Sequence, residues 1–362
     1  MSGPRKVALS VVWALGLFLV AEFALQLRSQ IRYGASVFNV LSAETTYQFH
    51  EDLQLKLLRP SAVIQGSQAV IETNSMGLRS PELPVEKGKS DLRVVLLGAS
   101  SVMGTYTRAN EEIVSYRLEA YLDEAFPDRR IDVINAGIAG YGLQDQRRMF
   151  EELIVPMKPD LLIWYSGFND ISGYCRKQSK SDATIRRLPQ LQLPSWLLSI
   201  ELVTKNSLWL RTTAASKQDV IDPESINLER YRNDVDALLS SVALRKIPML
   251  VATNARSFRS DMPMQMQLAL SETARYYNSC FDLAGLHKVY DRHNDILAER
   301  AQAYNFPVLK MDQLVPGGRE YFGDATHFSV KGSDYVARLI FRELQRLHAL
   351  EGPVRTAAEK QP

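Results

Sequence analysis

Short apolar runs alternate with helix-length amphipathic segments along most of this chain. The strand-like runs are Arg93–Gly98, Ile131–Asn135, Asp160–Ser166, Ile247–Thr253 and Pro307–Met311. Continuous apolar strands that alternate with helices indicate a parallel sheet covered on both faces. We therefore predict an α/β fold in three layers, α/β/α. In such sheets the ligand site lies beyond the carboxyl ends of the strands, so the residues that follow each run are the candidates for chemistry.

The segments between the strands repeat their apolar residues with the period of a helix. They are Glu111–Ala125, Gln144–Ile154, Leu228–Arg245, Ser271–Tyr304 and Gly332–His348. Before the first strand, residues 33–90 show only weak periodicity and are interpreted as a β-rich prelude and linker. Within this prelude, Ala62–Glu72 predicts two short strands about Gly66, and Thr73–Gly77 is a natural turn sequence.

One apolar run, at the amino terminus, is much longer than the others. Val7–Ala21 is uncharged and follows Arg5 and Lys6, and its apolar character continues beyond Glu22. A helix of about 20 residues crosses a bilayer, whereas the apolar part of a secretory signal is usually about 7–15 residues and ends at a small-x-small cleavage site. That site is poor here, because Leu19 stands where a small residue is preferred. We expect an uncleaved single-pass membrane anchor; a cleaved signal and a buried core helix are the alternatives.

The charges that flank this run give little information on its orientation. Arg28 and Arg32 follow the run as closely as the first basic pair precedes it, so the positive-inside rule is nearly balanced. The short amino terminus favours a start in the cytoplasm, with the rest of the chain on the periplasmic, or more generally extracytoplasmic, side of the membrane.

The predicted organisation has four parts along the chain. They are the anchor with its flank at 1–32, the prelude at 33–90, a main domain at 91–350 and a tail at 351–362. The main domain contains an insertion at 175–225, far longer than the usual connection of about 2–6 residues in α/β units. The insertion is apolar in patches, which suits either a lid or acyl-binding wall beside the site or a packed helical excursion.

The composition excludes some classes of function. The chain is 46% apolar and 23% charged, and 43 Lys and Arg against 41 Asp and Glu leave a net charge of only +2. That balance gives little attraction to phosphate backbones, so nucleic-acid binding is not expected. Cys175 and Cys280 are too few for a disulfide framework or a four-thiolate metal site. They are either free thiols or a single bridge.

The histidines outside the strand ends give no reason to expect a metal. His50, His287, His293 and His348 show no paired ligand spacing, and the chain has no His-Glu-x-x-His motif. His287 and His293 are six positions apart on a predicted helix and are expected at its surface. We expect neither a metal nor an organic cofactor.

Four polar motifs follow predicted strands. The first strand is followed by Gly-Ala-Ser-Ser with Ser100 in a glycine-bounded turn, and the second by a glycine-rich stretch that includes Gly140. The third strand ends in Gly-Phe-Asn-Asp, which contains Asn169. The last is followed by Asp-Ala-Thr-His, with Asp324 and His327 three positions apart.

Together these groups could carry out acyl transfer. A serine hydroxyl is a weak nucleophile unless an imidazole takes its proton, and the imidazole needs a carboxylate on its other nitrogen. The spacing of Asp324 and His327 lets the carboxylate reach Nδ1 and leaves Nε2 facing Ser100. The oxyanion would be met by the N–H groups of Ser100 and Gly140 and by the side-chain amide of Asn169.

Each of these residues has a commoner role when it is considered alone. A Gly-Ala-Ser-Ser turn is more often a helix cap or a phosphate-binding nest than the site of a nucleophile. Asn169 suits a turn, Gly140 close packing, and Asp324 a cap or loop. The presence of all four motifs at successive strand ends, in one order, favours catalysis.

The four motifs resemble the blocks of the SGNH (GDSL-type) hydrolases, serine esterases and lipases with a flavodoxin-like three-layer fold. The resemblance covers about residues 93–345 and makes 91–350 a catalytic domain. It implies Ser100 rather than Ser101 as nucleophile, Gly140 and Asn169 as oxyanion donors, and the Asp-x-x-His block as acid and base. The anchor and the prelude sequence Asn74–Arg79 are similar to those of membrane-anchored bacterial members.

One residue departs from the family pattern, because Ala99 stands where these hydrolases usually have Asp. That Asp is not part of the triad, so the mechanism is not removed, but the change leaves a slow or degenerate enzyme possible. The resemblance implies a serine esterase or deacylase that hydrolyses or transfers an acyl ester, on a cell-envelope carbohydrate or a lipid. The alternative is a non-catalytic envelope binding or scaffold protein that retains the fold.

Overall fold

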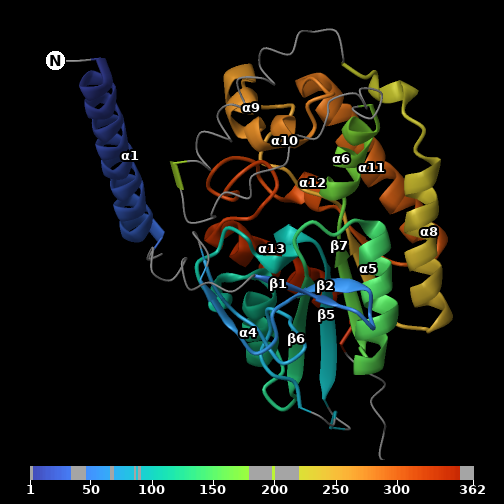
Figure 1. Cartoon of the computed structure of the whole chain (residues 1–362). Helices are drawn as coiled ribbons and strands as arrows, with labels where there is room; N and C mark the ends of the chain where they lie inside the picture. Colours follow the sequence, from blue (N-terminus) through green and yellow to red (C-terminus); the bar gives the residue numbers. More distant parts are fainter. Residues whose placement is uncertain are drawn as a thin grey trace, which may run out of the picture.

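A computed structural model describes residues 3–33, 46–65, 69–84, 87–88, 91–178, 198–199 and 220–350. Its centre is a parallel sheet with strand order β6-β5-β7-β8-β9 (Figure 1). The strands are β5 (Leu92–Gly98), β6 (Ile131–Gly137), β7 (Leu161–Tyr165), β8 (Met249–Ala252) and β9 (Val308–Leu309). Each of the five runs predicted from the sequence forms a strand, so the predicted parallel sheet is confirmed.

Helices cover both faces of the sheet, as the sequence predicted (Figure 1). One layer contains α4 (Val114–Ala125) and α13 (Val330–Arg346), and the other contains α5 (Leu143–Met149), α8 (Glu229–Leu244) and α11 (Leu283–Ala303). Because strand side chains alternate between faces, β5 contributes to two separate cores. Val94 and Leu96 pack with Leu118 of α4, whereas Val95 and Leu97 pack with Leu238 of α8. The three-layer α/β/α architecture is therefore observed.

The register of the three central strands determines where a site can form. Gly98, the last residue of β5, pairs with Gly137 of β6 and with Tyr165 of β7. Tyr165 in turn pairs with Ala252 of β8. The carboxyl ends of four strands therefore lie side by side at one edge of the sheet, and the loops that follow them meet there.

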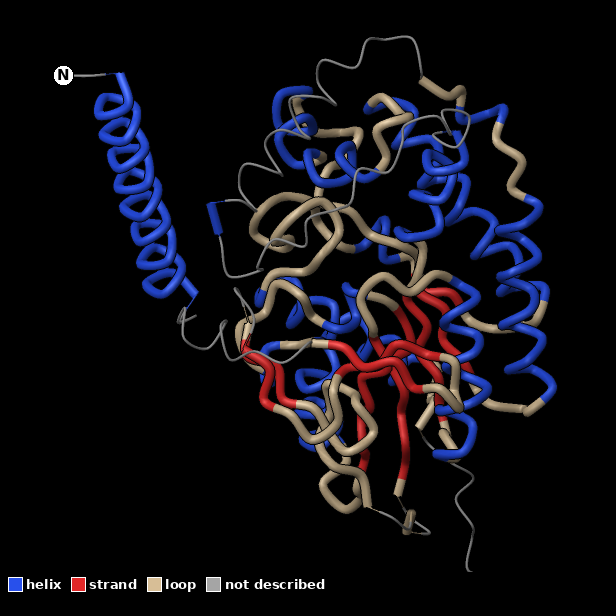
Figure 2. Tube along the Cα trace, viewed as in Figure 1, coloured by secondary structure: helices blue, strands red, loops and turns tan. Residues whose placement is uncertain are grey.

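Two antiparallel hairpins precede the sheet (red in Figure 2). They are β1 (Tyr47–His50) with β2 (Leu55–Leu58), and β3 (Val63–Gln65) with β4 (Val70–Glu72). The sequence predicted β3 and β4 but missed β1 and β2. Leu55 and Leu58 are buried in the same core as Val95 and Met149 of the main domain. The described part of the prelude thus shares the core of the main domain.

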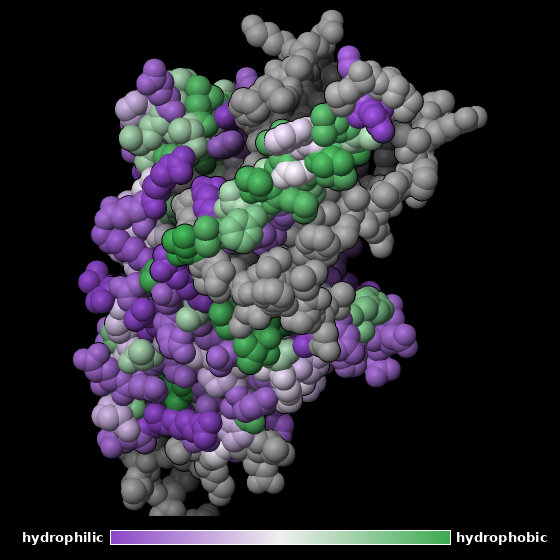
Figure 3. Space-filling view, turned by 60° about the vertical axis from the view of Figure 1, so that its left-hand side comes forward, coloured by the Kyte–Doolittle hydropathy of each residue, from purple (hydrophilic) through white to green (hydrophobic). Residues whose placement is uncertain are grey.

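The amino-terminal helix α1 (Gly3–Tyr33) has 31 residues and carries its apolar side chains on the outside. Val7, Trp13 and Phe23 are 65–70% exposed, and α1 forms the green band across the face in Figure 3. The segment Arg5–Arg28 is long and apolar enough to cross a membrane, a property that a signal sequence shares. Glu22 is an exception, because it is buried and its carboxylate accepts the N–H groups of residues 198 and 199 at 2.9 Å.

The predicted single helix Ser271–Tyr304 is wrong in one respect, because the structure breaks it into α10 (Glu272–Tyr277) and α11. The side chain of Asp282 accepts the N–H of Gly285 at 2.7 Å and so caps a new helix amino terminus. The other α-helices within the described residues are α3 (Ser100–Met103), α6 (Phe168–Gln178), α9 (Met264–Leu270) and α12 (Met311–Leu314).

In the described part of the chain, three short helices have 3₁₀ geometry and one has π geometry. The 3₁₀ turns are η1 (Asn110–Glu112), η3 (Val155–Met157) and η6 (Pro223–Ser225), and the π segment is η2 (Phe150–Ile154). Most of the predicted insertion at 175–225, and the whole tail at 351–362, lie outside the described residues, so the expected lid or acyl-binding wall stays a prediction.

Candidate active site

Ser100 is separated from the end of β5 by Ala99 alone and is the first residue of the one-turn helix α3. Gly104 ends that helix with a φ of 82°, and its N–H donates to the carbonyl oxygen of Ser100 at 3.1 Å. Gly98 must lack a side chain, because a Cβ there would lie 2.4 Å from the carbonyl oxygen of Tyr165. The sharp strand-to-helix turn that the sequence predicted around Ser100 therefore forms at the edge of the sheet.

His327 lies between Ser100 and Asp324. Its Nε2 atom is 2.7 Å from Ser100 Oγ, and its Nδ1 atom is 2.8 Å from Asp324 Oδ2. The other carboxylate oxygen of Asp324 accepts the backbone N–H groups of Thr326 and His327, both at 2.9 Å. The structure thus brings the predicted hydroxyl, imidazole and carboxylate into one hydrogen-bonded line.

The electrostatics of Asp324 determine which nitrogen of His327 carries the hydrogen. Burial alone raises the pKa of Asp324, but hydrogen bonds from His327 and from two backbone N–H groups more than offset it and hold the pKa below its usual value. An ionised carboxylate only accepts, so Nδ1 of His327 donates to it. Nε2 is then an acceptor and receives the hydrogen of the Ser100 hydroxyl.

The glycine-rich loop after β6 packs directly on the turn that carries Ser100. A Cβ on Gly137 would lie 2.3 Å from the backbone nitrogen of Met103, so only glycine permits this approach. The Asn135 side chain donates to the carbonyl oxygen of Val102 at 2.7 Å and accepts the N–H of Gly137 at 2.9 Å. Gly140 adopts a φ of 87°, a left-handed conformation that favours glycine.

Asn169 stands in the first turn of α6, across from this loop. Its side-chain Nδ2 donates to the carbonyl oxygen of Tyr141 at 2.9 Å, so its amide lies against the residue that follows Gly140. An amide carries two N–H groups, and one of them remains for a further acceptor. Two of the three predicted oxyanion donors, Gly140 and Asn169, line the same pocket, and the third, Ser100, lies outside its lining.

That pocket has a volume of about 340 Å³ and lies between the glycine loop and the helices α5, α6 and α8. The carboxylate of Asp170 forms part of its wall and accepts the N–H of Leu143, the first residue of α5, at 3.1 Å. Burial raises the pKa of Asp170 to about 6. Asp170 therefore ties α6 to the end of the loop that carries Gly140.

Comparison with known proteins now identifies the family. The sequence profile of the GDSL-like lipase/acylhydrolase family matches residues 94–340, which is more than half of the chain. This chain belongs to that family. Its members hydrolyse acyl esters. A search of curated proteins gives no significant match.

Solved structures of similar fold include two with names that describe ester hydrolysis. The lipase/acylhydrolase of Enterococcus faecalis is 17% identical, with a TM-score of 0.42, over 71% of this chain and 96% of its own. Axe2, an acetylxylan esterase of Geobacillus stearothermophilus, is 15% identical, with a TM-score of 0.42, over 71% of this chain and 96% of its own.

In this GDSL-like chain the prelude supports the turn around Ser100. The guanidinium of Arg79 is fully buried, and its Nη1 donates to the carbonyl oxygens of Met103 and Gly104 at 3.1 and 2.8 Å. Its Nε donates to Asn110 Oδ1 at 2.7 Å, and burial lowers its pKa to about 10. The sequence singled out Asn74–Arg79 by resemblance alone and missed this contact.

Two further contacts that the sequence did not reveal hold the loop of His327. The ring of Tyr106 stacks on the imidazole, with ring centres 5.5 Å apart and planes 25° apart. Ser101 Oγ donates to the carbonyl oxygen of Thr326 at 3.1 Å and so joins the nucleophile turn to the acid–base loop. A Cβ on Gly323 would lie 2.2 Å from the ring of Tyr106, so glycine is required for this stacking.

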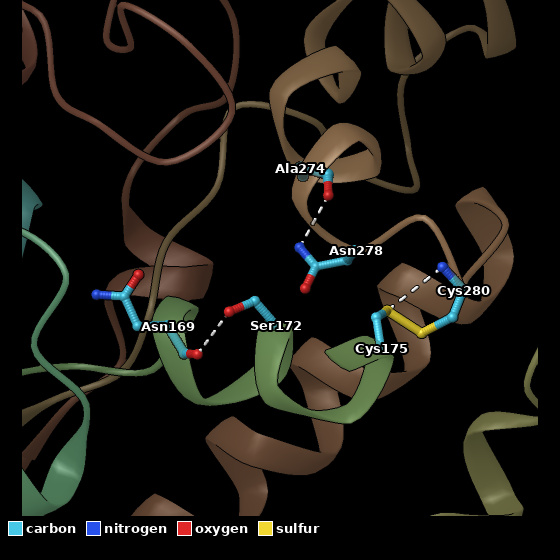
Figure 4. The surroundings of a disulfide bond; sticks show 6 residues. All are labelled: Asn169, Ser172, Cys175, Ala274, Asn278 and Cys280. Carbon is cyan, nitrogen blue, oxygen red and sulfur yellow. Dashed lines mark hydrogen bonds between the residues drawn. A yellow bond between two sulfur atoms is a disulfide. The ribbon is translucent and has the colours of Figure 1, made fainter. Parts of the chain in front are cut away.

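Cys175 and Cys280 form a disulfide, which answers a question that the sequence left open. The bridge joins α6 to the segment before α11, and the two residues are 105 positions apart. Figure 4 shows Asn169 and Cys175 on the same helix, with Asn169 near its start. The disulfide therefore fixes the helix that carries the predicted amide donor.

The surface position predicted for His293 is wrong. His293 is only 2% exposed, stacks on Tyr231 with ring centres 3.8 Å apart, and has its Nε2 atom 3.1 Å from the hydroxyl of Tyr174. Burial lowers its pKa to about 3, so the ring is neutral. The six-residue spacing from His287 gave no signal for this, because it separates the two positions on the helix without telling which one faces the core.

Proposed function

We propose that this protein is a serine esterase or deacylase that uses Ser100, His327 and Asp324. The observation that carries the proposal is the line of two hydrogen bonds through His327, at 2.7 and 2.8 Å. Ser100 Oγ attacks the ester carbonyl carbon while Nε2 of His327 takes the hydroxyl proton. Asp324 holds the imidazole in the required tautomer and stabilises the imidazolium that forms.

The first half-reaction ends in an acyl-enzyme. The tetrahedral intermediate collapses, the bond between the carbonyl carbon and the alcohol oxygen breaks, and the imidazolium returns its proton to the departing alcohol. An acceptor hydroxyl then attacks the acyl-Ser100, with His327 again as base. When the acceptor is water the protein is a hydrolase, and when it is another hydroxyl the acyl group is transferred.

The negative oxygen of both intermediates needs preorganised donors. The N–H groups of Ser100 and Gly140 and the side chain of Asn169 take this role in the proposal. Two contacts support this role: the loop after β6 packs on the turn of Ser100 through Gly137, and Asn169 donates to Tyr141, the residue after Gly140.

The proposed location is the outer face of a membrane. The apolar helix α1 serves as an uncleaved single-pass anchor, and the catalytic domain faces the periplasm or another extracytoplasmic space. The disulfide between Cys175 and Cys280 supports this location, since such bonds persist in oxidising compartments. The substrate is an acyl ester, on a cell-envelope carbohydrate or a lipid.

A fluorophosphonate probe tests the nucleophile directly. We expect the full-length chain to be labelled, Ser100→Ala to lose all labelling, and the neighbouring Ser101→Ala to keep it. Hydrolysis of p-nitrophenyl acetate should follow the same order. Labelling that survives in folded Ser100→Ala would remove Ser100 from the mechanism.

Ala99 favours one other candidate function, a non-catalytic envelope binding or scaffold protein. It occupies the position at which related hydrolases usually carry Asp, and it leaves the turn without a carboxylate at that position. A wild-type chain that is folded, but neither labelled by the probe nor active on p-nitrophenyl acetate, would support this alternative.

A further inference from the structure

The pocket beside Gly140 and Asn169 has several charged and amide side chains in its lining. Its polar lining comes from the helices α5, α6 and α8 and the loop before α8. These side chains are Gln144, Asp145, Asp170, Asn227, Arg230 and Asp234. Among the described residues, the lining has three carboxylates and one cation, and the ammonium of Lys56 lies beside Gly140, where it donates to the carbonyl oxygen of Ala139 at 3.0 Å.

We infer that this pocket holds the alcohol portion of the substrate, and that this portion is a carbohydrate that is neutral or carries an amine. The inference rests on the proposed esterase function. Because Gly140 and Asn169 line this pocket, an ester whose carbonyl oxygen they bind lies beside it. Hydroxyl groups both donate and accept, so a sugar can satisfy carboxylates, amides and a guanidinium together.

An alkyl chain is a poor occupant of the same pocket. It would take the carboxylates and amides out of water without replacing their hydrogen bonds, which is costly for polar groups and more so for charged ones. A lipid alcohol or a long acyl chain must therefore lie elsewhere, and the polar wall selects against it.

The charges also select among sugars. Arg230 Nε lies 3.8 Å from Asp234 Oδ2, so the positive charge of Arg230 is partly neutralised by its neighbour on α8. Asp145 accepts the N–H of Gly142 at 3.1 Å, and Asp170 accepts that of Leu143. The three carboxylates outnumber the two cations, Arg230 in the lining and Lys56 beside Gly140, and this excess of negative charge repels a uronate or a phosphorylated sugar and attracts an amino sugar.

Asp234 is the best residue for a test. It lies on α8 with its side chain 24% exposed, and besides Arg230 it is contacted by Gln144, whose Nε2 donates to it at 3.2 Å. A change of its charge alters the pocket without removing any residue proposed for bond making. Asp295, an exposed carboxylate on α11 outside the pocket lining, provides a matched control.

The experiment compares an O-acetylated neutral hexose oligomer with the corresponding O-acetylated uronate oligomer, using the full-length chain in detergent. We expect the wild type to favour the neutral oligomer in kcat/KM by about tenfold or more. Asp234→Lys should narrow that ratio by about tenfold, Asp234→Asn by a smaller factor in the same direction, and Asp295→Lys should leave it unchanged.

Three results would overturn the inference: a wild type that favours the uronate or shows no preference, a ratio that does not move in folded Asp234→Asn and Asp234→Lys, or a preference for a long-chain acylglycerol over both sugars. Hydrolysis of p-nitrophenyl acetate, measured in every variant, keeps the proposed function separate. If Ser100→Ala hydrolyses that ester like wild type, the esterase proposal fails, whatever the sugar ratio shows.

Discussion

The two sides of the candidate site are held in different ways. On the acid–base side, Asp324 and His327 are three residues apart, and the backbone of their own turn donates two hydrogen bonds to the carboxylate. On the oxyanion side, Gly140 lies in the loop after β6 and Asn169 lies in the first turn of α6, and the hydrogen bond from Asn169 to Tyr141 joins the two segments. One side is encoded locally, and the other depends on the packing of α6. Changes in the two sides should therefore have different consequences.

The largest expected effect comes from breaking the locally encoded side. Asp324→Asn keeps the shape of the side chain but places an amide, instead of a carboxylate, beside Nδ1. His327 is then no longer held in the tautomer that accepts the hydrogen bond from Ser100. We expect kcat for p-nitrophenyl acetate to fall by about 10⁴, with little change in KM. For His327→Ala we expect kcat to fall at least as far. A loss of less than tenfold in Asp324→Asn would show that the carboxylate is not needed to orient the imidazole.

Removal of the Asn169 amide on the oxyanion side should lower kcat less than a change on the acid–base side. For Asn169→Ala we expect kcat to fall by about 10²–10³, because one oxyanion donor is lost while nucleophile and base remain. Fluorophosphonate labelling should slow but persist. Asn278→Ala removes a buried amide near the disulfide and outside the pocket, and it is the control for loss of packing alone. Equal kinetic effects in the two variants would argue against a role for Asn169 in the reaction.

The buried guanidinium behind Ser100 should affect stability more than chemistry. Arg79→Met leaves the carbonyl oxygens of Met103 and Gly104 without their donor, and we expect a loss of roughly 3 kcal/mol in unfolding free energy. Arg79→Lys keeps the positive charge but not the planar guanidinium with its several donors, and it should recover only part of the lost unfolding free energy. Denaturant unfolding measures both. A neutral result for Arg79→Met would mean that the prelude does not support the turn.

Removal of the disulfide tests whether the oxyanion side depends on the covalent link between α6 and a distant segment. In Cys175→Ser/Cys280→Ser a crosslink over 105 residues is lost, and we expect a loss of about 2–4 kcal/mol. Because the bridge holds α6, kcat should fall severalfold while the rate of probe labelling changes less. The losses of stability and of kcat in this variant should equal those of the wild type under reducing conditions. A variant with the stability and kcat of the oxidised wild type would contradict this role.

The smallest effect is the pH dependence contributed by Asp170. Its pKa, raised by burial to about 6, exceeds the value of about 3.9 expected in the unfolded chain, so the folded state binds the extra proton between these values. Stability from this group is therefore present below pH 4 and lost as the pH rises through 6, by at most about 3 kcal/mol. Asp170→Asn should show a flatter stability profile between pH 4 and 7 than wild type. Parallel profiles of stability against pH in wild type and variant would show that the pKa of Asp170 is not raised.

Features that are encoded locally were predictable from the sequence, and features that depend on long-range packing were not. Continuous apolar strands predicted the sheet, and the Asp-x-x-His spacing predicted the acid–base contact because both groups lie in one turn. Tyr106, Arg79 and the burial of His293 were not predictable, since each depends on which distant element packs beside it. The hairpin β1–β2 was missed because its four-residue strands carry mixed polar and apolar side chains. The pairing of the two cysteines likewise needed the fold.

The most direct test of the central claim is to find the acyl group on the enzyme. After rapid mixing with p-nitrophenyl acetate and an acid quench, mass spectrometry of the peptides should show one acetyl group, carried by Ser100. It should accumulate more when deacylation is slowed at low pH. Turnover without acetylation of Ser100, or acetylation at another side chain that survives in Ser100→Ala, would contradict the account.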